Sequence, residues 1–124
     1  MAKALLVDVM ENKVEEVDVE SLEDYYRLIH CDTVEIVPRL IGDKRFDIIA
    51  DEEGLFVNDP LISAIDSAGK GMLVGNLIVC GEPNGDGKMT PLTDEDIRFI
   101  RGHIRQLGTI LHPEGHCMIC DLDW

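Results

Sequence analysis

The 124-residue sequence has few aromatic residues and few cationic ones. Phe, Trp and Tyr make up only 5% of it, so a hydrophobic core must be built mainly from Val, Ile and Leu. Apolar residues still account for 45% of the chain, which is enough for a core and excludes global disorder. A chain of this length is typical of one compact domain.

The sequence also lacks a long hydrophobic run. No apolar stretch is long enough to cross a bilayer as a helix, so no membrane association is expected. The first ten residues include Lys3 and Asp8, and they are too short and too polar for a secretion signal. We therefore expect a cytoplasmic protein in which the four cysteines are not joined in disulfides.

The charge balance is strongly acidic, with 25 Asp and Glu against 11 Lys and Arg and a formal net charge of −14. Such a surface repels phosphate backbones, so direct binding of DNA or RNA is disfavoured. Solubility is the ordinary reason for a charge of this kind. The alternatives are docking on a basic protein surface, including imitation of nucleic acid, and binding of a divalent cation.

The first part of the chain predicts a hairpin followed by a short helix. Residues 3–9 and 13–20 are β-like, and Asn12 suits the turn between them. Ser21, with Asp24 three residues later, resembles a capping box and predicts that a helix begins there.

The rest of the chain predicts further strands and helices. Strands are expected on both sides of a turn at residues 42–43, and Pro38 marks an edge or a bulge. Residues 58–70 are interpreted as a helix or a loop, and residues 71–82 as a central strand in which Gly75 indicates a bulge or a close backbone approach. The apolar spacing from residue 93 to residue 107 is typical of one amphipathic helix.

These elements predict the fold class and the domain limits. We expect a single α+β domain, with a mainly antiparallel sheet of about five strands and two to three helices packed on one of its faces. The domain is expected to span residues 3–107. Residues 108–124 are expected to be a C-terminal extension that packs as a strand or an arm.

The C-terminal extension carries a cluster of metal-ligating residue types. A Cys-x-x-Cys spacing allows two thiolates to hold one zinc ion, and two nearby histidines could join them. The chain has no second Cys-x-x-Cys, and the motif does not stand between a strand and a helix start as in thioredoxin-like redox pairs. Packing as a strand is therefore favoured over zinc binding and redox chemistry, and no cofactor is expected. The candidate ligands are His112, His116, Cys117 and Cys120.

Other patterns do not support catalysis. Three adjacent carboxylates, at residues 51–53, precede a turn glycine, but nothing nearby would desolvate them and separate their pKa values. The oxygen-rich stretch 84–95 fails as a calcium loop, because Lys88 and Met89 occupy positions that need an oxygen ligand and a glycine. We therefore expect a protein that is not an enzyme.

Several sequence segments together resemble a known family. They are the "DEEG" turn at residues 51–54, "LVGNLIVCG" at residues 73–81 and "PLTDEDI" at residues 91–97. Their order is similar to domain-of-unknown-function family 3846, small proteins of phages, plasmids and gut bacteria, over residues 3–101. The resemblance implies an uncharacterised α+β domain in a mobile-element setting, and it brings no catalytic residues with it.

The leading functional hypothesis is an acidic binding domain that engages a protein partner or a small ligand. The alternatives are an acidic decoy that docks on a host nucleic-acid-binding protein, and a zinc-binding protein. A homodimer through edge strands near Pro38 and in the extension stays open. The expected contact surface combines polar side chains with a glycine that permits close approach: Asp51, Glu53, Asn58, Asp59, Gly75 and Asn76.

Overall fold

The computed structural model describes residues 2–31, 33–51, 61–81, 90–109 and 112–123. Within them lie two helices and ten strands. The helices are α1 (Leu22–Ile29) and α2 (Asp94–Arg101). The strands are β1 (Ala2–Asp8), β2 (Lys13–Val19), β3 (Val34–Ile41), β4 (Lys44–Asp51), β5 (Ile62–Ile65), β6 (Gly71–Val74), β7 (Leu77–Cys80), β8 (Ile104–Leu107), β9 (His116–Ile119) and β10 (Leu122–Asp123).

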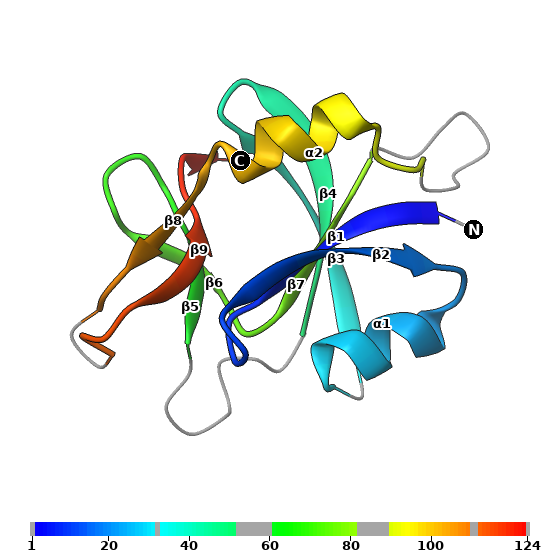
Figure 1. The fold of residues 1–124 in the computed structure, drawn as a ribbon, viewed down its shortest axis with the longest axis horizontal. Coiled ribbons are helices and arrows are strands. Elements are labelled where there is room, and N and C mark those ends of the chain that lie inside the picture. Colours follow the sequence, from blue (N-terminus) through cyan, green and yellow to red (C-terminus); the bar gives the residue numbers. More distant parts are fainter. Residues whose placement is uncertain (1, 32, 52–60, 82–89, 110–111, 124) are drawn as a thin grey trace.

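The strands form two sheets, which are seen beside each other in Figure 1. The first has six strands in the order β10-β3-β4-β7-β1-β2, and the second has four in the order β6-β5-β9-β8. Neighbouring strands are antiparallel, except that β5 and β9 pair in parallel. The prediction of one small α+β domain is confirmed, but the single sheet of about five strands is wrong. The sequence pattern identifies strands, whereas tertiary contacts decide which of them pair.

The six-stranded sheet is buried on both faces, because successive residues of a strand point to opposite sides. On one face, Leu5 and Val7 belong to an apolar cluster that includes residues of α2 and of the second sheet. On the other face, Ala4 and Leu6 pack in a second cluster with Ile29 of α1. The helices therefore cover opposite faces, and the prediction that they share one face is wrong. Unbroken aliphatic residues along β1 give it two apolar faces, and each needs its own cover.

The predicted N-terminal hairpin is confirmed, and its turn connects the two sheets. Asn12 adopts a left-handed backbone conformation with φ 55°. Its Oδ1 accepts a hydrogen bond from the Cys117 N–H at 2.9 Å and another from the Gln106 side chain at 2.8 Å. One asparagine thus joins the β1–β2 turn to both β8 and β9.

The predicted first helix is also confirmed. The Asp24 carboxylate accepts hydrogen bonds from the N–H groups of Glu20 at 2.8 Å and Ser21 at 3.3 Å, as expected at a capped helix start. The helix ends at His30, whose φ of 65° is left-handed. This ending stops the helix before β3 begins.

The helix predicted up to residue 107 ends at Arg101, so its second half is wrong. Its start is as predicted, because the Thr93 hydroxyl accepts a hydrogen bond from the Asp96 N–H at 3.1 Å. Gly102 follows the last turn, and residues 104–107 form β8 against β9. The pairing with β9 satisfies the backbone groups that a longer helix would have satisfied internally.

The helix or loop expected at residues 58–70 is wrong where the chain is described. Residues 52–60 lie outside the described part, and Ile62–Ile65 is the strand β5. A hairpin turn follows, in which the Asp66 carboxylate accepts hydrogen bonds from the N–H groups of Ala68 at 2.9 Å and Lys70 at 2.8 Å. Asp and Gly residues suit both a helix end and a hairpin turn, and the partner strands β6 and β9 favour the turn.

The predicted central strand is divided in two at Gly75, where φ is +78°. The Gly75 N–H donates to the Leu61 carbonyl at 2.8 Å, which holds the break against the start of β5. The part after the break is β7, which lies between β4 and β1 and is buried throughout. The central position of this apolar segment is thus confirmed, and its glycine marks a change from one sheet to the other.

Candidate functional site

The contact surface expected from the sequence is only partly within the described chain. Glu53, Asn58 and Asp59 lie outside it. Asp51 ends β4 and is half-buried opposite Val34 of β3. The binding role of these residues stays a prediction.

Asn76 is an internal residue, with an exposed fraction of 1%. Its Oδ1 accepts a hydrogen bond from the buried Val9 N–H at 3.0 Å. Its Nδ2 is also buried and has no hydrogen-bond partner among the described residues. The Asn76 amide therefore supports the loop after β1 and does not face the solvent.

The two histidines of the C-terminal cluster approach each other edge to face, with ring centroids 6.1 Å apart. The His116 Nε2 lies 2.6 Å from the Ile62 carbonyl oxygen, so it donates a hydrogen bond to β5. That nitrogen carries a proton in this geometry and has no lone pair for a metal ion.

The two thiols of the same cluster face different surroundings. The Cys117 thiol lies 3.7 Å from the Asp8 carbonyl oxygen and 3.9 Å from that of Lys13, whereas the Cys120 sulfur lies 4.0 Å from the Met118 carbonyl oxygen. Burial raises the pKa of both thiols. In the part of the chain that the structure describes, no group of three or more His, Cys, Asp or Glu is placed to hold a metal ion. Zinc binding stays a prediction. Within the extension, His116–Ile119 form β9 and Leu122–Asp123 form β10.

A third thiol, that of Cys80, is buried at the end of β7. Its sulfur lies 4.0 Å from the Tyr25 hydroxyl of α1, in the apolar cluster between that helix and the sheet. Burial raises the pKa of Cys80 to about 11. A thiol with this pKa is almost wholly protonated at neutral pH and is a poor nucleophile.

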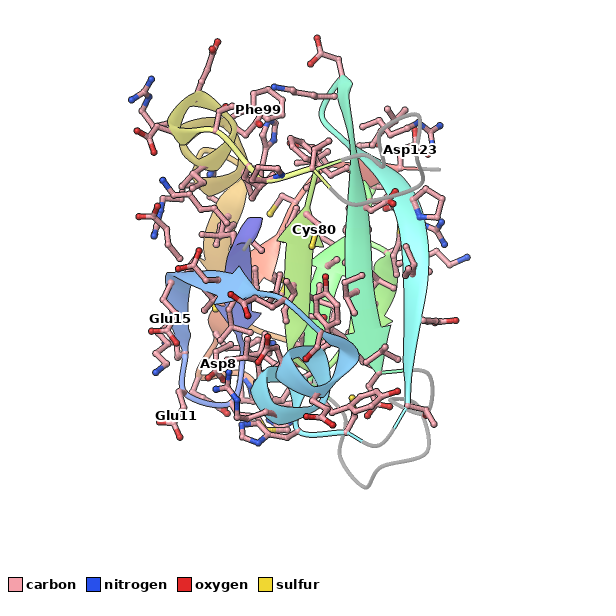
Figure 2. The ribbon with its side chains drawn as sticks, turned by 90° about the vertical axis from the view of Figure 1, so that its right-hand side faces the viewer. Asp8, Glu11, Glu15, Cys80, Phe99 and Asp123 are labelled. Carbon is pink, nitrogen blue, oxygen red and sulfur yellow. The ribbon has the colours of Figure 1, made fainter. Side chains whose placement is uncertain are left out.

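The exposed carboxylates are unevenly distributed along the chain. Residues 11–24 contain seven Asp and Glu and a single lysine. They include the end of the β1–β2 turn, the strand β2, which is the last strand of the six-stranded sheet, and the start of α1. Figure 2 shows Glu11 and Glu15 at the outer margin of this hairpin. We name this surface the acidic edge, and its carboxylates are those of Glu11, Glu15, Glu16, Asp18, Glu20 and Glu23.

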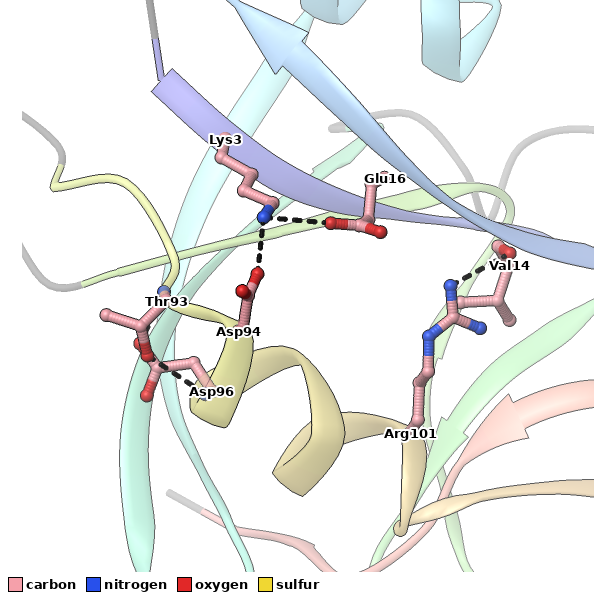
Figure 3. Close-up of polar contacts among 7 residues, drawn as sticks. All are labelled: Lys3, Val14, Glu16, Thr93, Asp94, Asp96 and Arg101. Atoms are coloured by element: carbon pink, nitrogen blue, oxygen red, sulfur yellow. Dashed lines mark hydrogen bonds and ion pairs between the residues drawn. The ribbon is translucent and has the colours of Figure 1, made fainter.

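Few cations neutralise the acidic edge. Lys3 of β1 reaches across to Glu16 at 3.0 Å and also contacts Asp94 of α2 at 2.6 Å, as Figure 3 shows. These hydrogen bonds, first with Asp94 and then with Glu16, raise the pKa of Lys3. Lys13 contacts Glu15 at 3.5 Å. All of these groups are exposed, so the pairs are screened by solvent and leave the local excess of negative charge in place.

The remaining carboxylates of the edge have no ion pair within the described residues. They are the exposed side chains of Glu11, Asp18, Glu20 and Glu23. The total charge of the chain does not reveal this local concentration. The run of seven carboxylates in fourteen residues was the available signal.

Comparisons with known proteins identify a family but give no activity. No curated protein and no solved structure matches the chain. None of the helices in the described residues is long and apolar enough to span a membrane. The sequence model of one family, described as "Domain of unknown function (DUF3846)", matches residues 1–107. The strands β9 and β10 lie beyond that match, yet each contributes residues to the core shared by both sheets. With most of its length matched, the chain belongs to the family of domains of unknown function DUF3846.

Proposed function

We propose that this protein is a non-enzymatic binding domain that engages a basic surface of a protein partner through the acidic edge. The observation that carries the proposal is the concentration of seven carboxylates and one lysine in residues 11–24, on an exposed strand edge. Solubility alone needs a net charge, but it does not need that charge gathered at one place.

The physical effect of the acidic edge is a negative local potential. Such a field increases the rate at which a positively charged surface arrives, and it repels nucleic acid. A strand edge also offers extended contact area, which favours a protein over a small ligand. The decoy hypothesis is a narrower form of the same proposal, in which the partner is a nucleic-acid-binding protein.

The state of the thiols supports a binding role over covalent chemistry. Cys80, Cys117 and Cys120 all have a raised pKa because of burial, and a protonated thiol is a weak nucleophile and a weak metal ligand. These three cysteines therefore contribute to the packing of the fold. In keeping with the family, we propose a cytoplasmic protein of a phage, a plasmid or a gut bacterium.

The test is a titration of the protein against fluorescently labelled oligolysine, followed by anisotropy. One variant carries Glu11→Gln and Asp18→Asn in the acidic edge. Its matched control carries Glu35→Gln and Asp43→Asn, two exposed carboxylates on β3 and in the turn after it. Each variant removes two negative charges from the formal −14, so the net charge is the same in both.

We expect the edge variant to bind oligolysine about fivefold more weakly, since two exposed ion pairs of about 0.5 kcal/mol each are lost. The control variant should bind as the wild type does. Equal weakening of both variants would mean that the probe responds only to net charge, and the proposed site would be rejected.

A further inference from the structure

We infer that the outer edge of β2 takes up a Lys- or Arg-rich extended segment of the partner as an added strand. The inference rests on the proposed function and specifies how the acidic edge binds. It requires that β2 presents unpaired backbone groups, that nothing covers them, and that the side chains select a basic segment over other occupants.

The register of the sheet shows which backbone groups of β2 point outward. The Leu92 N–H donates to the Lys3 carbonyl at 2.8 Å, on the side of β1 that faces away from β2. Backbone direction alternates along a strand, so Ala4 and Leu6 direct their N–H and C=O groups toward β2. Their partners there are Val17 and Glu15.

The residues between these partners, Glu16 and Asp18, therefore direct their backbone groups away from the sheet. β2 pairs only with β1 in the described sheet, and no other described element bonds to these backbone groups. At the start of the strand the situation differs, because the Arg101 side chain lies 3.5 Å from the Val14 carbonyl (Figure 3). The free part of the edge thus begins after Val14 and offers two donors and two acceptors.

At the opposite margin of the same sheet, the short strand β10 pairs only with the end of β3, at Leu40 and Ile41. The rest of the outer side of β3 is protected in a different way. Along β3, residues whose backbone groups bond to β4 alternate with residues whose backbone groups point away from β4. Pro38 is one of the residues that point away. Proline has no N–H to donate, and the Arg39 side chain donates to the Pro38 carbonyl at 2.8 Å. Homodimerisation through β3 stays a prediction, which this arrangement disfavours. The edge of β2 carries no proline in residues 13–19, so beyond Val14 the described residues protect it by charge.

Charge decides between the possible occupants of the β2 edge. A second copy of the chain would place one row of carboxylates against another, and like charges in opposed cross-strand positions are destabilising. Lys or Arg in the same positions would form favourable cross-strand pairs with Glu16 and Asp18. The other side chains of an added strand would lie beside Val17, which packs against the cluster under α1. The geometry thus suits a segment in which basic and apolar residues alternate.

The test uses three labelled peptides of alternating lysine and valine, which are identical in charge. One is unmodified, one is N-methylated at the backbone nitrogens of its lysines, and one at those of its valines. In an extended peptide the lysine N–H groups face one margin and the valine N–H groups face the other. Strand addition forms hydrogen bonds along one margin of the peptide only, so it is weakened by methylation of that margin. Attraction between charges does not depend on methylation of either margin.

We expect one methylated peptide to bind at least about tenfold more weakly than the unmodified one, because two hydrogen bonds are lost, and the other to bind as the unmodified one does. Loss with methylated lysine indicates an antiparallel strand, and loss with methylated valine a parallel one. Equal binding of all three peptides overturns strand addition but leaves the proposed function intact. No binding of the unmodified peptide overturns both.

A protein variant gives an independent measurement. Asp18→Pro removes a charge and one outward N–H, whereas Asp18→Asn removes the charge alone. The outward N–H of Asp18 makes no bond to β1, so proline is compatible with this edge position. We expect Asp18→Pro to bind the unmodified peptide at least about threefold more weakly than Asp18→Asn, and equal affinities would contradict the inference.

Discussion

The Asn12 side-chain oxygen connects the two sheets, and replacing Asn12 with alanine removes this oxygen. The Asn12 Oδ1 is the acceptor for the buried Cys117 N–H at 2.9 Å and for the Gln106 side chain at 2.8 Å. The Gln106 side chain is exposed and can bond to water instead. The Cys117 N–H belongs to a residue with an exposed fraction of 2%, so it loses its acceptor without a substitute.

The size of the effect follows from two contributions. A buried N–H without an acceptor costs about 1–3 kcal/mol. Alanine at a left-handed position, here with φ 55°, costs about 1 kcal/mol more than asparagine. Together the substitution should lower the free energy of unfolding by about 3 kcal/mol, a large part of the ~5–15 kcal/mol typical of a domain. The melting temperature should fall by about 10 °C.

The assay is urea unfolding followed by far-UV circular dichroism, with two matched variants. Asn12→Asp keeps an oxygen acceptor and tolerates the left-handed backbone, so it should stay within about 0.5 kcal/mol of the wild type. Asn12→Gly keeps the backbone conformation and loses the acceptor, so it should fall between Asp and Ala. An alanine variant as stable as the wild type, or an aspartate variant as unstable as the alanine one, would show that the Asn12 oxygen does not stabilise the contact between the sheets.

Four further predictions concern the Cys80 thiol, two carboxylates and the candidate zinc ligands. The Cys80 thiol should resist a thiol reagent near neutral pH until urea is added, and rapid labelling of the folded protein would contradict its burial. Because the folded pKa of Cys80 is raised from 9.0 to about 11, the stability it contributes is complete below pH 9.0 and lost as the pH rises through about 11, which urea titrations at several pH values would detect. Backbone hydrogen bonds lower the pKa of Asp24, and the Lys3 ammonium lowers that of Asp94, so the urea midpoint should fall as the pH drops below the ordinary carboxyl value of 3.8, and a midpoint unchanged on acidification would contradict these contacts. Because the Cys117 thiol and the His116 Nε2 donate to backbone carbonyls, EDTA should leave the melting temperature unchanged, and a fall on chelation that zinc reverses would instead support a zinc site.

The sequence was most informative where local chemistry decides the structure. Asn12 forms the turn through its own left-handed backbone conformation. The Ser21 and Asp24 capping pair and Thr93 at the second helix start act through neighbours within a few residues. Such signals are independent of the rest of the fold. For that reason the hairpin and both helix starts were predictable.

The sequence was least informative where a distant strand decides the structure. Ile97, Ile100 and Ile104 have helical spacing, yet Ile104 pairs with Ile119 in a sheet. The segment that begins at Ile62 becomes a strand because β6 and β9 lie on its two sides. Neither partner is visible from the segment itself, since tertiary pairing overrides local propensity.

The candidate site was partly accessible from the sequence. Total charge pointed to a binding role for an acidic surface, but the residues chosen for it were selected by residue type near turns. Asn76 was expected to offer its amide to a partner and instead accepts the Val9 N–H inside the protein. The edge position of β2, which gives the carboxylates of residues 11–24 their proposed role, depends on the strand order and could not be predicted without it.

Binding at the β2 edge can be observed residue by residue, by recording the backbone amide NMR signals of the protein during titration with the unmodified lysine–valine peptide. If the peptide adds to β2 as a strand, the largest shifts should occur at residues 15–19, and the amide hydrogens of Glu16 and Asp18 should exchange more slowly with solvent once the peptide is bound. Largest shifts elsewhere, for example along β3, or unchanged exchange at those two amides would contradict strand addition at β2.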